Sequence, residues 1–212
     1  MKLYTYFRSS ASFRVRIALH LKGLTYEPVF VHLAKGEHRQ PQYTKVNAQA
    51  LVPTLELDDG TRLTQSLAIM EWLEERHSTP ALLPRDALGR SRVRAISDLI
   101  ACEIHPLNNL RVLQHLKRAL GQSQDQIDTW YRHWIADGLQ KLEAELAAPG
   151  TGKFCHGDSP TLADCCLVPQ IFNAKRYESD LAPYPKTVRV FDNCMKLEAF
   201  DRAQPSKQPD AE

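Results

Sequence analysis

The sequence predicts an α/β domain followed by an all-helical domain. Three observations support this fold class: residues 3–32 follow a strand, helix, strand order, an Asp59-Gly60 pair marks the turn of a β-hairpin, and no convincing strand follows the proline-containing stretch at 78–85. That stretch suits a linker, because proline stops helices. The predicted domains are therefore residues 1–80 and 86–212.

The first domain begins with a βαβ unit. Residues 3–6 alternate and carry β-forming side chains, and a helix that starts at about Ser12 ends at Gly23, a residue favoured just beyond a helix end. Residues 26–32 form the second strand. Two strands joined in this way should be parallel, with a right-handed crossover.

A loop, a hairpin and a second helix complete this domain. Residues 35–49 are polar and predict a loop that can contain one irregular helical piece, whereas 51–57 and 61–64 predict the two strands of the hairpin. Ser66 is the expected cap of the next helix. Its apolar stripe contains Leu67, Ile69, Met70 and Leu73.

The second domain shows helical periodicity throughout. Thr161 and Asp164 have the spacing of a capping box at one helix start. The polar tail at 204–212 is expected to be frayed. The periodic segments are 89–120, which Pro106 interrupts, and 125–146, 161–177 and 186–197.

Composition argues against several classes of function. The 212 residues carry a net charge of only +2 with no dense block of Lys and Arg, so we expect no nucleic-acid partner. No apolar run approaches the roughly 20 residues of a membrane span, and no signal-peptide core follows Met1. We therefore expect a cytoplasmic protein without a membrane partner.

The cysteines predict neither disulfides nor a metal centre. There are five, an odd number without a CxxC pair, which favours reduced thiols. Cys102 lies near His105 and Cys155 precedes His156, but neither pair is repeated at a second ligand-bearing segment. We expect no metal site.

The stretch from Tyr6 to Leu19 is the strongest candidate for a functional site. Ser9, Ser10 and Ser12 crowd the start of the first helix, and Arg8 adds a positive charge just before it. A helix N-terminus offers free backbone N–H groups to an anion, which hydroxyl groups can also bind. An ordinary capped helix with a surface arginine would have the same residues.

This stretch resembles the signature of zeta-class glutathione transferases, SSCxWRVRIAL. Ala11 stands where the class usually has cysteine, and Phe13 where it has tryptophan. The resemblance covers nearly the whole chain, since the small α/β domain, the Val52-Pro53 pair before the hairpin, the Gln65-Ser66 pair at a helix start and the helical domain all match. It implies a thioredoxin-like first domain, a helical second domain and bound glutathione.

The resemblance also assigns residues of the first domain to glutathione. Val52-Pro53 would be a cis-proline turn that leaves the Val52 backbone to pair with the cysteinyl part. Gln65 and Ser66 would hold the γ-glutamyl carboxylate, and His38 the glycyl end. From the residues alone, an edge-strand proline, an ordinary helix cap and a solvated loop histidine remain alternatives.

Two segments of the helical domain match as well. Residues 104–111 resemble the class stretch IQPLxNLxVL, in which His105 replaces glutamine and Arg111 a small polar residue. The resemblance places His105, Asn109 and Arg111 near glutathione, partly across a dimer interface, and Arg176 in the substrate pocket. A proline-kinked helix with a polar face and a basic helix end are the alternatives.

The implied activity is glutathione-dependent cis–trans isomerisation of maleylpyruvate to fumarylpyruvate in aromatic degradation. Ser9 would hydrogen-bond the thiolate, with Ser10 and the Ala11 N–H behind it, while Arg8 and Arg176 bind the carboxylates of the dicarboxylate substrate. Because Ala11 lacks a thiol, the reactive sulfur must come from glutathione. A homodimer is also implied. Alternatives are action on maleylacetoacetate, a conjugating or dehalogenating transferase, and a non-catalytic glutathione-binding module.

Overall fold

The computed structural model describes residues 1–212 and divides into two compact units. The first unit contains Met1–Leu82 together with Met195–Glu212, and the second contains Leu83–Cys194. The boundary between the two units, at Leu82 and Leu83, lies within the expected linker at 78–85. The end of the chain differs from the expected division, because Met195–Glu212 groups with the first unit.

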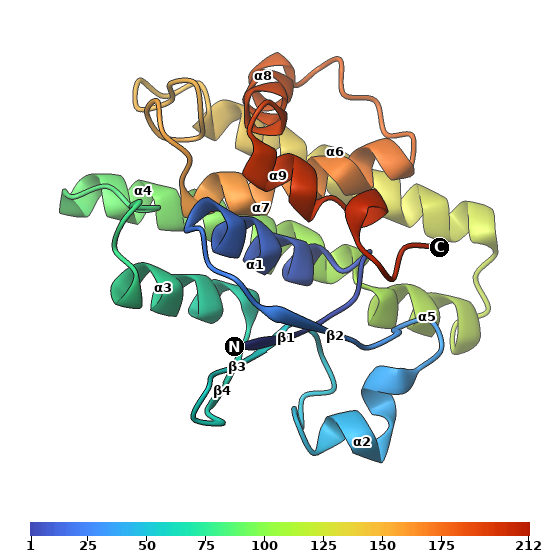
Figure 1. The fold of residues 1–212 in the computed structure, drawn as a ribbon. Helices are drawn as coiled ribbons and strands as arrows, with labels where there is room; N and C mark the ends of the chain where they lie inside the picture. The colour runs from blue at the N-terminus through green and yellow to red at the C-terminus, as the bar shows by residue number, and fades with distance from the viewer. The chain divides into compact units, whose positions relative to one another are not determined.

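A four-stranded sheet lies at the centre of the first unit (Figure 1). Its spatial order is β2-β1-β3-β4, with β1 parallel to β2 and antiparallel to β3, and β3 paired with β4 as a hairpin. The predicted βαβ unit and hairpin are both confirmed. The strands are β1 (Lys2–Thr5), β2 (Glu27–Phe30), β3 (Thr54–Glu56) and β4 (Arg62–Thr64).

Two helices cover one face of this sheet. Helix α1 (Ser10–Leu21) and helix α3 (Ser66–Arg76) lie on the same side, and the short α2 (Pro41–Thr44) lies on the other (Figure 1). A single-turn 3₁₀ helix at Glu37–Arg39 precedes α2. The core between sheet and helices is fully buried and includes Leu3, Ile17, Leu55, Ile69 and Leu73.

A buried ion pair joins the C-terminal ends of α1 and α3. The Lys22 Nζ atom lies 2.8 Å from Glu74 Oε2 and also donates hydrogen bonds to the His77 and Pro80 carbonyls. Glu74 in turn accepts a hydrogen bond from the Leu82 N–H. Lys22 and Glu74 together thus hold residues 77–82, the segment that follows α3 at the end of the first unit.

The C-terminal segment is docked and not frayed as the sequence suggested. Helix α9 (Glu198–Ala203) packs along α1, and a 3₁₀ turn at Pro205–Lys207 follows (Figure 1). Asp210 accepts a hydrogen bond from the Phe7 N–H, and Glu212 lies 3.0 Å from His32 Nε2. The expectation was wrong because it rested on composition, whereas these anchors are contacts with residues far away in the sequence.

The second unit is helical, as predicted. An isolated bridge between Thr151 and Gly157 is its one β-type pairing. A capping box begins α7, where Asp164 accepts hydrogen bonds from both the N–H and the hydroxyl of Thr161. The main helices are α4 (Ala87–Asp98), α5 (Leu110–Arg118), α6 (Gln124–Glu145), α7 (Leu162–Arg176) and α8 (Pro185–Met195).

The chain between α4 and α5 changes its helical form. A π-helical segment, η2 (Leu99–Ile104), continues α4 and passes into a 3₁₀ turn, η3 (His105–Asn108). Gly138 of α6 faces this segment, and a Cβ atom there would overlap the Ile104 side chain. Close packing of η2 against α6 thus depends on a glycine, and π-helical segments often occur at functional sites.

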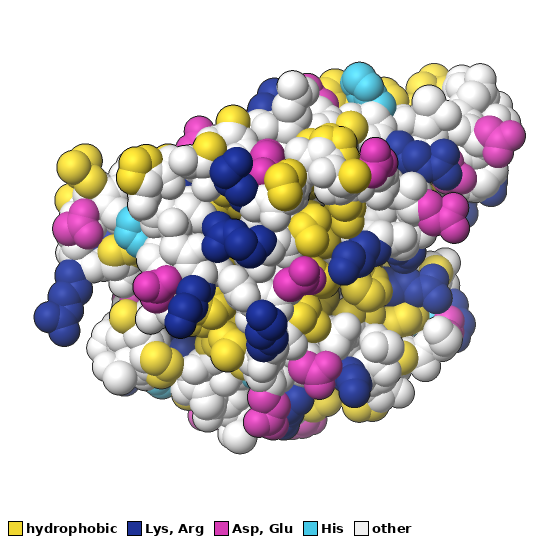
Figure 2. Space-filling view, turned by 90° about the horizontal axis from the view of Figure 1, so that it is seen from above, with side chains coloured by type: hydrophobic (Ala, Val, Ile, Leu, Met, Phe, Trp, Pro, Cys, Tyr) yellow, Lys and Arg dark blue, Asp and Glu magenta, His cyan; other side chains and the backbone are white.

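No helix of the structure combines the length and the hydropathy that a membrane span requires. On the face shown in Figure 2, Lys and Arg side chains are spread among Asp and Glu side chains. All five cysteines are free thiols, of which four are buried.

Candidate active site

Ser9, Ser10 and Ser12, together called the serine corner, lie where the chain passes from β1 into α1. Ser9 is the N-cap of α1, and its Oγ atom accepts a hydrogen bond from the Ser12 N–H at 3.2 Å. The helix therefore begins earlier than the expected start near Ser12. Because a hydroxyl can accept and donate at once, the Ser9 O–H keeps a proton to offer to an anion.

The first turn of α1 supplies further donors. A helix leaves its first N–H groups without an acceptor inside the helix, and Ala11 lies in this first turn of α1. Together with the helix dipole they favour negative charge at this end. The Arg8 side chain is exposed, and its guanidinium carbon lies 4.8 Å from the centre of the Phe7 ring.

Ser66 lies at the start of α3 but does not cap it. The N-cap is Gln65, which makes no side-chain capping bond, so the expectation of a Ser66 cap is wrong. Ser66 is instead the first helical residue, and its hydroxyl accepts a hydrogen bond from the buried Arg14 at 3.2 Å. This contact brings a buried positive charge to the helix end where the sequence predicts a carboxylate site.

Gln65 has an unusual backbone conformation. Its φ is +67°, in the left-handed region that residues other than glycine rarely occupy. Its side-chain amide donates a 2.6 Å hydrogen bond to Gln49 Oε1. Strained backbone of this kind is concentrated at ligand-binding sites, which agrees with the predicted role of Gln65.

The remaining first-unit candidates lie in the segments before and within the hairpin. The Val52–Pro53 peptide bond is cis, as the resemblance implied, and Val52 is buried. His38 lies in the 3₁₀ turn and is 8% exposed, so it is not a solvated loop histidine. Its Nδ1 atom is buried without a hydrogen-bond partner. Burial, followed by the charge of Arg39, lowers the pKa of His38, which favours the neutral ring.

Three candidates in the second unit lie close together in sequence. His105 begins η3 and is half-buried, and Asn109 caps α5 by accepting a hydrogen bond from the Arg111 N–H at 3.1 Å. The Arg111 side chain is exposed. Helix α6 holds this turn, because Trp130 donates to the Leu107 carbonyl at 2.8 Å.

Arg176 is the last residue of α7 and is exposed. Its guanidinium carbon lies 4.8 Å from the centre of the Tyr177 ring, and its side chain is hydrogen-bonded to the Tyr131 hydroxyl. The Tyr131 and Tyr177 rings stack, with centroids 3.5 Å apart and an interplanar angle of 10°. Burial raises the pKa of Tyr131 to about 12, so the phenol remains neutral beside the arginine.

Tyr131 also contacts the turn that carries His105. Its backbone carbonyl accepts a hydrogen bond from the Asn108 side chain at 3.2 Å. One residue of α6 therefore supports both groups of second-unit candidates.

Comparison with known proteins identifies the family. Residues 8–76 match the glutathione S-transferase N-terminal domain and residues 114–194 the C-terminal domain. A maleylpyruvate isomerase of Ralstonia sp is 50% identical over 213 residues, which cover 100% of both chains. The chain belongs to the glutathione S-transferase family.

Two solved structures of this family share the whole fold. A holo structure described as maleylpyruvate isomerase, a bacterial glutathione S-transferase in the zeta class, has 49% identity and a TM-score of 0.97, with 100% of both chains covered. Maleylacetoacetate isomerase from Methylobacterium extorquens AM1, with bound malonate and glutathione, has 39% identity and the same TM-score and coverage.

The donor set of this glutathione S-transferase fits its tripeptide cofactor. Glutathione carries a thiol and two terminal carboxylates. The serine corner and the Arg14–Ser66 contact offer donors at the N-termini of two different helices of the first unit. The buried, unpartnered Nδ1 atom of His38 is a further polar group for which a ligand atom would be a suitable partner.

Sequence reasoning missed the two arginines within the signature. Arg14 is 2% exposed and Arg16 is 0% exposed, although both lie on a helix whose other residues are mostly apolar. Charged residues are almost never fully buried unless they are paired. Two arginines inside an apolar helical stretch were therefore a signal that internal partners exist.

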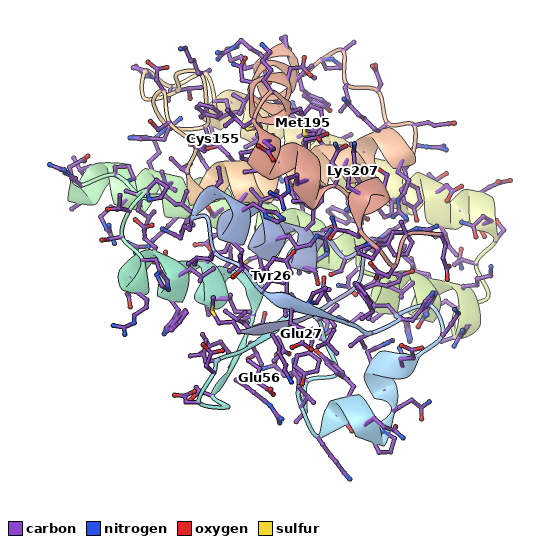
Figure 3. All side chains as sticks on the ribbon, viewed as in Figure 1. Tyr26, Glu27, Glu56, Cys155, Met195 and Lys207 are labelled. Atoms are coloured by element: carbon purple, nitrogen blue, oxygen red, sulfur yellow. The ribbon has the colours of Figure 1, made fainter.

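A surface pocket of about 600 Å³ lies elsewhere in the first unit. It is at the opposite end of α1 from the serine corner and is lined in part by Tyr26 and Lys207, which Figure 3 labels. None of the predicted site residues lines it. The pocket is therefore separate from the serine corner.

Proposed function

We propose that this chain is a glutathione-dependent isomerase that converts maleylpyruvate into fumarylpyruvate. The observation that carries the proposal is the 50% identity, over the full length of both chains, to a maleylpyruvate isomerase. The serine corner supports it, because Ser9 offers a hydroxyl at a helix N-terminus where a thiolate would be stabilised.

The reaction needs a double bond that becomes single for long enough to rotate. Bound glutathione supplies a thiolate whose reversible addition to the cis double bond allows this rotation. The Ser9 hydroxyl donates a hydrogen bond to the sulfur, and Ser10 and the Ala11 N–H add to the positive potential there. These groups lower the thiol pKa from its ordinary value of about 8.5.

The other site residues hold the tripeptide. In the proposed arrangement Gln65 and Ser66 bind the γ-glutamyl carboxylate, and the buried Arg14 orients the Ser66 hydroxyl. The Val52 backbone pairs with the cysteinyl part, and His38 contacts the glycyl end. His105, Asn109 and Arg111 are the proposed second-unit contacts.

Arg8 and Arg176 are the proposed ligands of the substrate carboxylates. Both side chains are exposed and each lies over an aromatic ring, which restricts its orientation. A planar guanidinium binds a carboxylate through two parallel hydrogen bonds, and its charge also favours the negative charge that develops on the substrate.

One assay tests the proposal against its alternatives. Purified protein is mixed with maleylpyruvate and a small fraction of an equivalent of glutathione, and substrate, product and free thiol are followed together. Conversion to fumarylpyruvate over many turnovers without loss of thiol is expected. Stoichiometric loss of thiol would indicate a conjugating or dehalogenating transferase, and no turnover would indicate a glutathione-binding module.

A second substrate is favoured by a specific observation. The maleylacetoacetate isomerase from Methylobacterium extorquens AM1 has the same TM-score of 0.97 as the maleylpyruvate isomerase structure. Both substrates carry a cis enone flanked by carboxylates. We expect the higher kcat/KM with maleylpyruvate, because that relative has the higher identity, and parallel kinetics on the two substrates decide between them.

We further propose a cytoplasmic homodimer. The proposal rests on the zeta-class resemblance, in which the stretch around Asn109 contributes across a subunit interface. Sedimentation velocity should give twice the mass of one chain, and a monomer at all concentrations would contradict the proposal.

A further inference from the structure

Tyr6 and Phe7, which follow the end of β1 and precede Arg8 and Ser9, are held by side chains from other parts of the first unit. The Phe7 N–H donates to Asp210 Oδ2 at 3.0 Å, and the Phe7 carbonyl accepts from Arg16 Nη2 at 3.0 Å. The Tyr6 carbonyl accepts two hydrogen bonds, from the Ser9 N–H at 3.0 Å and from Arg16 Nη1 at 3.3 Å. The backbone that leads into Ser9 is therefore fixed by one arginine and one aspartate.

The arginine that holds this backbone is Arg16. It is completely buried, and it also donates to Thr5 Oγ1 at 3.1 Å and to the Ala203 carbonyl at 3.1 Å. Burial lowers its pKa to about 10, against the opposing effects of Tyr26 and Asp210, so the guanidinium is charged at neutral pH. One buried cation thus joins the end of β1, the corner and the end of α9.

The aspartate that holds this backbone is Asp210, which lies 203 residues after Phe7 in the sequence. Its second oxygen, Oδ1, is buried without a hydrogen-bond partner. A carboxylate in that position is held by the Phe7 N–H and by the positive charge of Arg16. Beyond it, Glu212 lies 3.0 Å from His32 Nε2 and 3.3 Å from Lys35 Nζ, which fixes the end of the chain.

We infer that Arg16 and Asp210 are positioning residues for Ser9, and that the C-terminal segment (residues 203–212) belongs to the catalytic unit. They contact neither the thiol nor the substrate in this role. They fix the Tyr6–Phe7 backbone, from which the Ser9 hydroxyl and the first N–H groups of α1 take their place around the thiol. The inference rests on the proposed function in one respect, namely that Ser9 is the group that meets the sulfur.

The C-terminal location of Asp210 allows a sharp test. Three variants are compared with wild type: Asp210→Ala removes the acceptor, Asp210→Asn keeps an oxygen that accepts the same N–H, and Asp201→Ala removes another aspartate near the C-terminus, one that lies 3.9 Å from Lys207. For each, the thiol pKa of bound glutathione is titrated by the ultraviolet absorbance of the thiolate. The Kd of S-methylglutathione, kcat and Tm are also measured.

Asp210→Ala should raise the bound thiol pKa by about one unit. Below the wild-type thiol pKa this is a ten-fold loss of thiolate, which should lower kcat there about ten-fold. The Kd of S-methylglutathione should change less than two-fold, because its peptide contacts lie elsewhere. Asp210→Asn should restore both quantities to within about two-fold of wild type, and Asp201→Ala should match wild type.

An unchanged thiol pKa in Asp210→Ala would overturn the inference, as would a shift of equal size in Asp201→Ala. If Asp210→Ala does not fold, Asp210→Glu replaces it, since the longer side chain moves the acceptor, and a wild-type titration in that variant would again overturn the inference. The titration needs no isomerase substrate. If the variants show the expected shifts in thiol pKa but the wild-type protein does not turn over maleylpyruvate, only the proposed function is contradicted.

Discussion

At the residue scale, Arg14 and Arg16 serve opposite ends of the proposed glutathione site. Two positions apart on a helix, side chains point to nearly opposite sides. Arg14 reaches Ser66 at the start of α3, whereas Arg16 reaches the Tyr6 and Phe7 carbonyls before the serine corner. The Arg14-Val15-Arg16 run of the signature therefore joins the expected carboxylate and thiol ends through one helix.

Ser9 is the residue with the largest expected effect on turnover. Ser9→Ala should lower kcat by about 10²- to 10³-fold, the usual loss when one donor to a developing or fixed anion is removed. Its matched control is Ser12→Ala, because the Ser12 hydroxyl is completely buried and has no hydrogen-bond partner. Steady-state kinetics should show near-normal turnover for that control. Equal losses in the two variants would remove Ser9 from the mechanism.

Tyr131 should act through Arg176. Tyr131→Phe removes the hydroxyl beside the guanidinium but keeps the stack on Tyr177, and it should raise KM for the dicarboxylate substrate about ten-fold with little change in KM for glutathione. Tyr184→Phe is the control, since its hydroxyl bonds the Ala136 carbonyl at 3.1 Å.

A double mutant tests whether the effect of Tyr131 on KM depends on Arg176. In an Arg176→Ala background, Tyr131→Phe should add no further change in KM, because its effect passes through the missing side chain. Additive changes would mean that Tyr131 acts on the substrate, or on the fold, independently of Arg176.

At the element scale, regular helices and strands could be predicted from local sequence patterns, whereas irregular helical segments could not. The βαβ unit, the hairpin and the capping box at Thr161 were predictable because their signals lie within a few neighbouring residues. The π-helical segment η2 reads as ordinary helix in the sequence. It depends on packing against α6, which sequence periodicity does not reveal.

The same distinction applies to the candidate site. The resemblance supplied Ser9, Gln65 and Arg176 because they lie within or beside matching motifs. Asp210 and Tyr131 were missed, since each acts on a residue distant in sequence and neither has a local pattern. Two arginines inside an apolar helical stretch, of which Arg16 is completely buried in the structure, were the one clue that the sequence contained.

The packing of η2 against α6 gives a prediction of its own. Gly138→Ala should lower the free energy of unfolding by about 1–3 kcal/mol, because the added methyl group would overlap the buried Ile104 side chain. Thermal unfolding should show a lower Tm. Ile104→Val in the same background removes a methyl group at the overlap and should recover part of the loss, whereas a further drop would mean that the overlap is relieved by other movements.

At the scale of the whole molecule, buried thiols should make stability fall in alkaline solution. Burial raises the pKa of Cys155 and Cys194 well above the ordinary thiol value. Above about pH 8.5 the unfolded chain loses protons that the folded chain keeps. The free energy of unfolding should therefore fall by about 1.4 kcal/mol per pH unit for each such thiol.

Urea unfolding between about pH 8.5 and 10 measures this slope. Cys155→Ala removes one ionisable thiol from both states, so its stability should fall less steeply than that of wild type by the contribution of one group. Parallel profiles for the two proteins would show that the Cys155 thiol ionises in the folded chain.

The discontinuity of the first unit has a consequence for how the protein is made. Residues 83–194 leave the ribosome before the C-terminal part of the first unit does, and domains of nascent chains fold as they emerge. The hydrogen bond from Phe7 to Asp210 can form only after the second unit has left the ribosome, because Asp210 follows that unit in the sequence. Under the proposed role of Asp210, a chain that stops at residue 194 would contain both matched family domains and still lack the residue that holds the backbone before Ser9, so activity would also require residues 195–212.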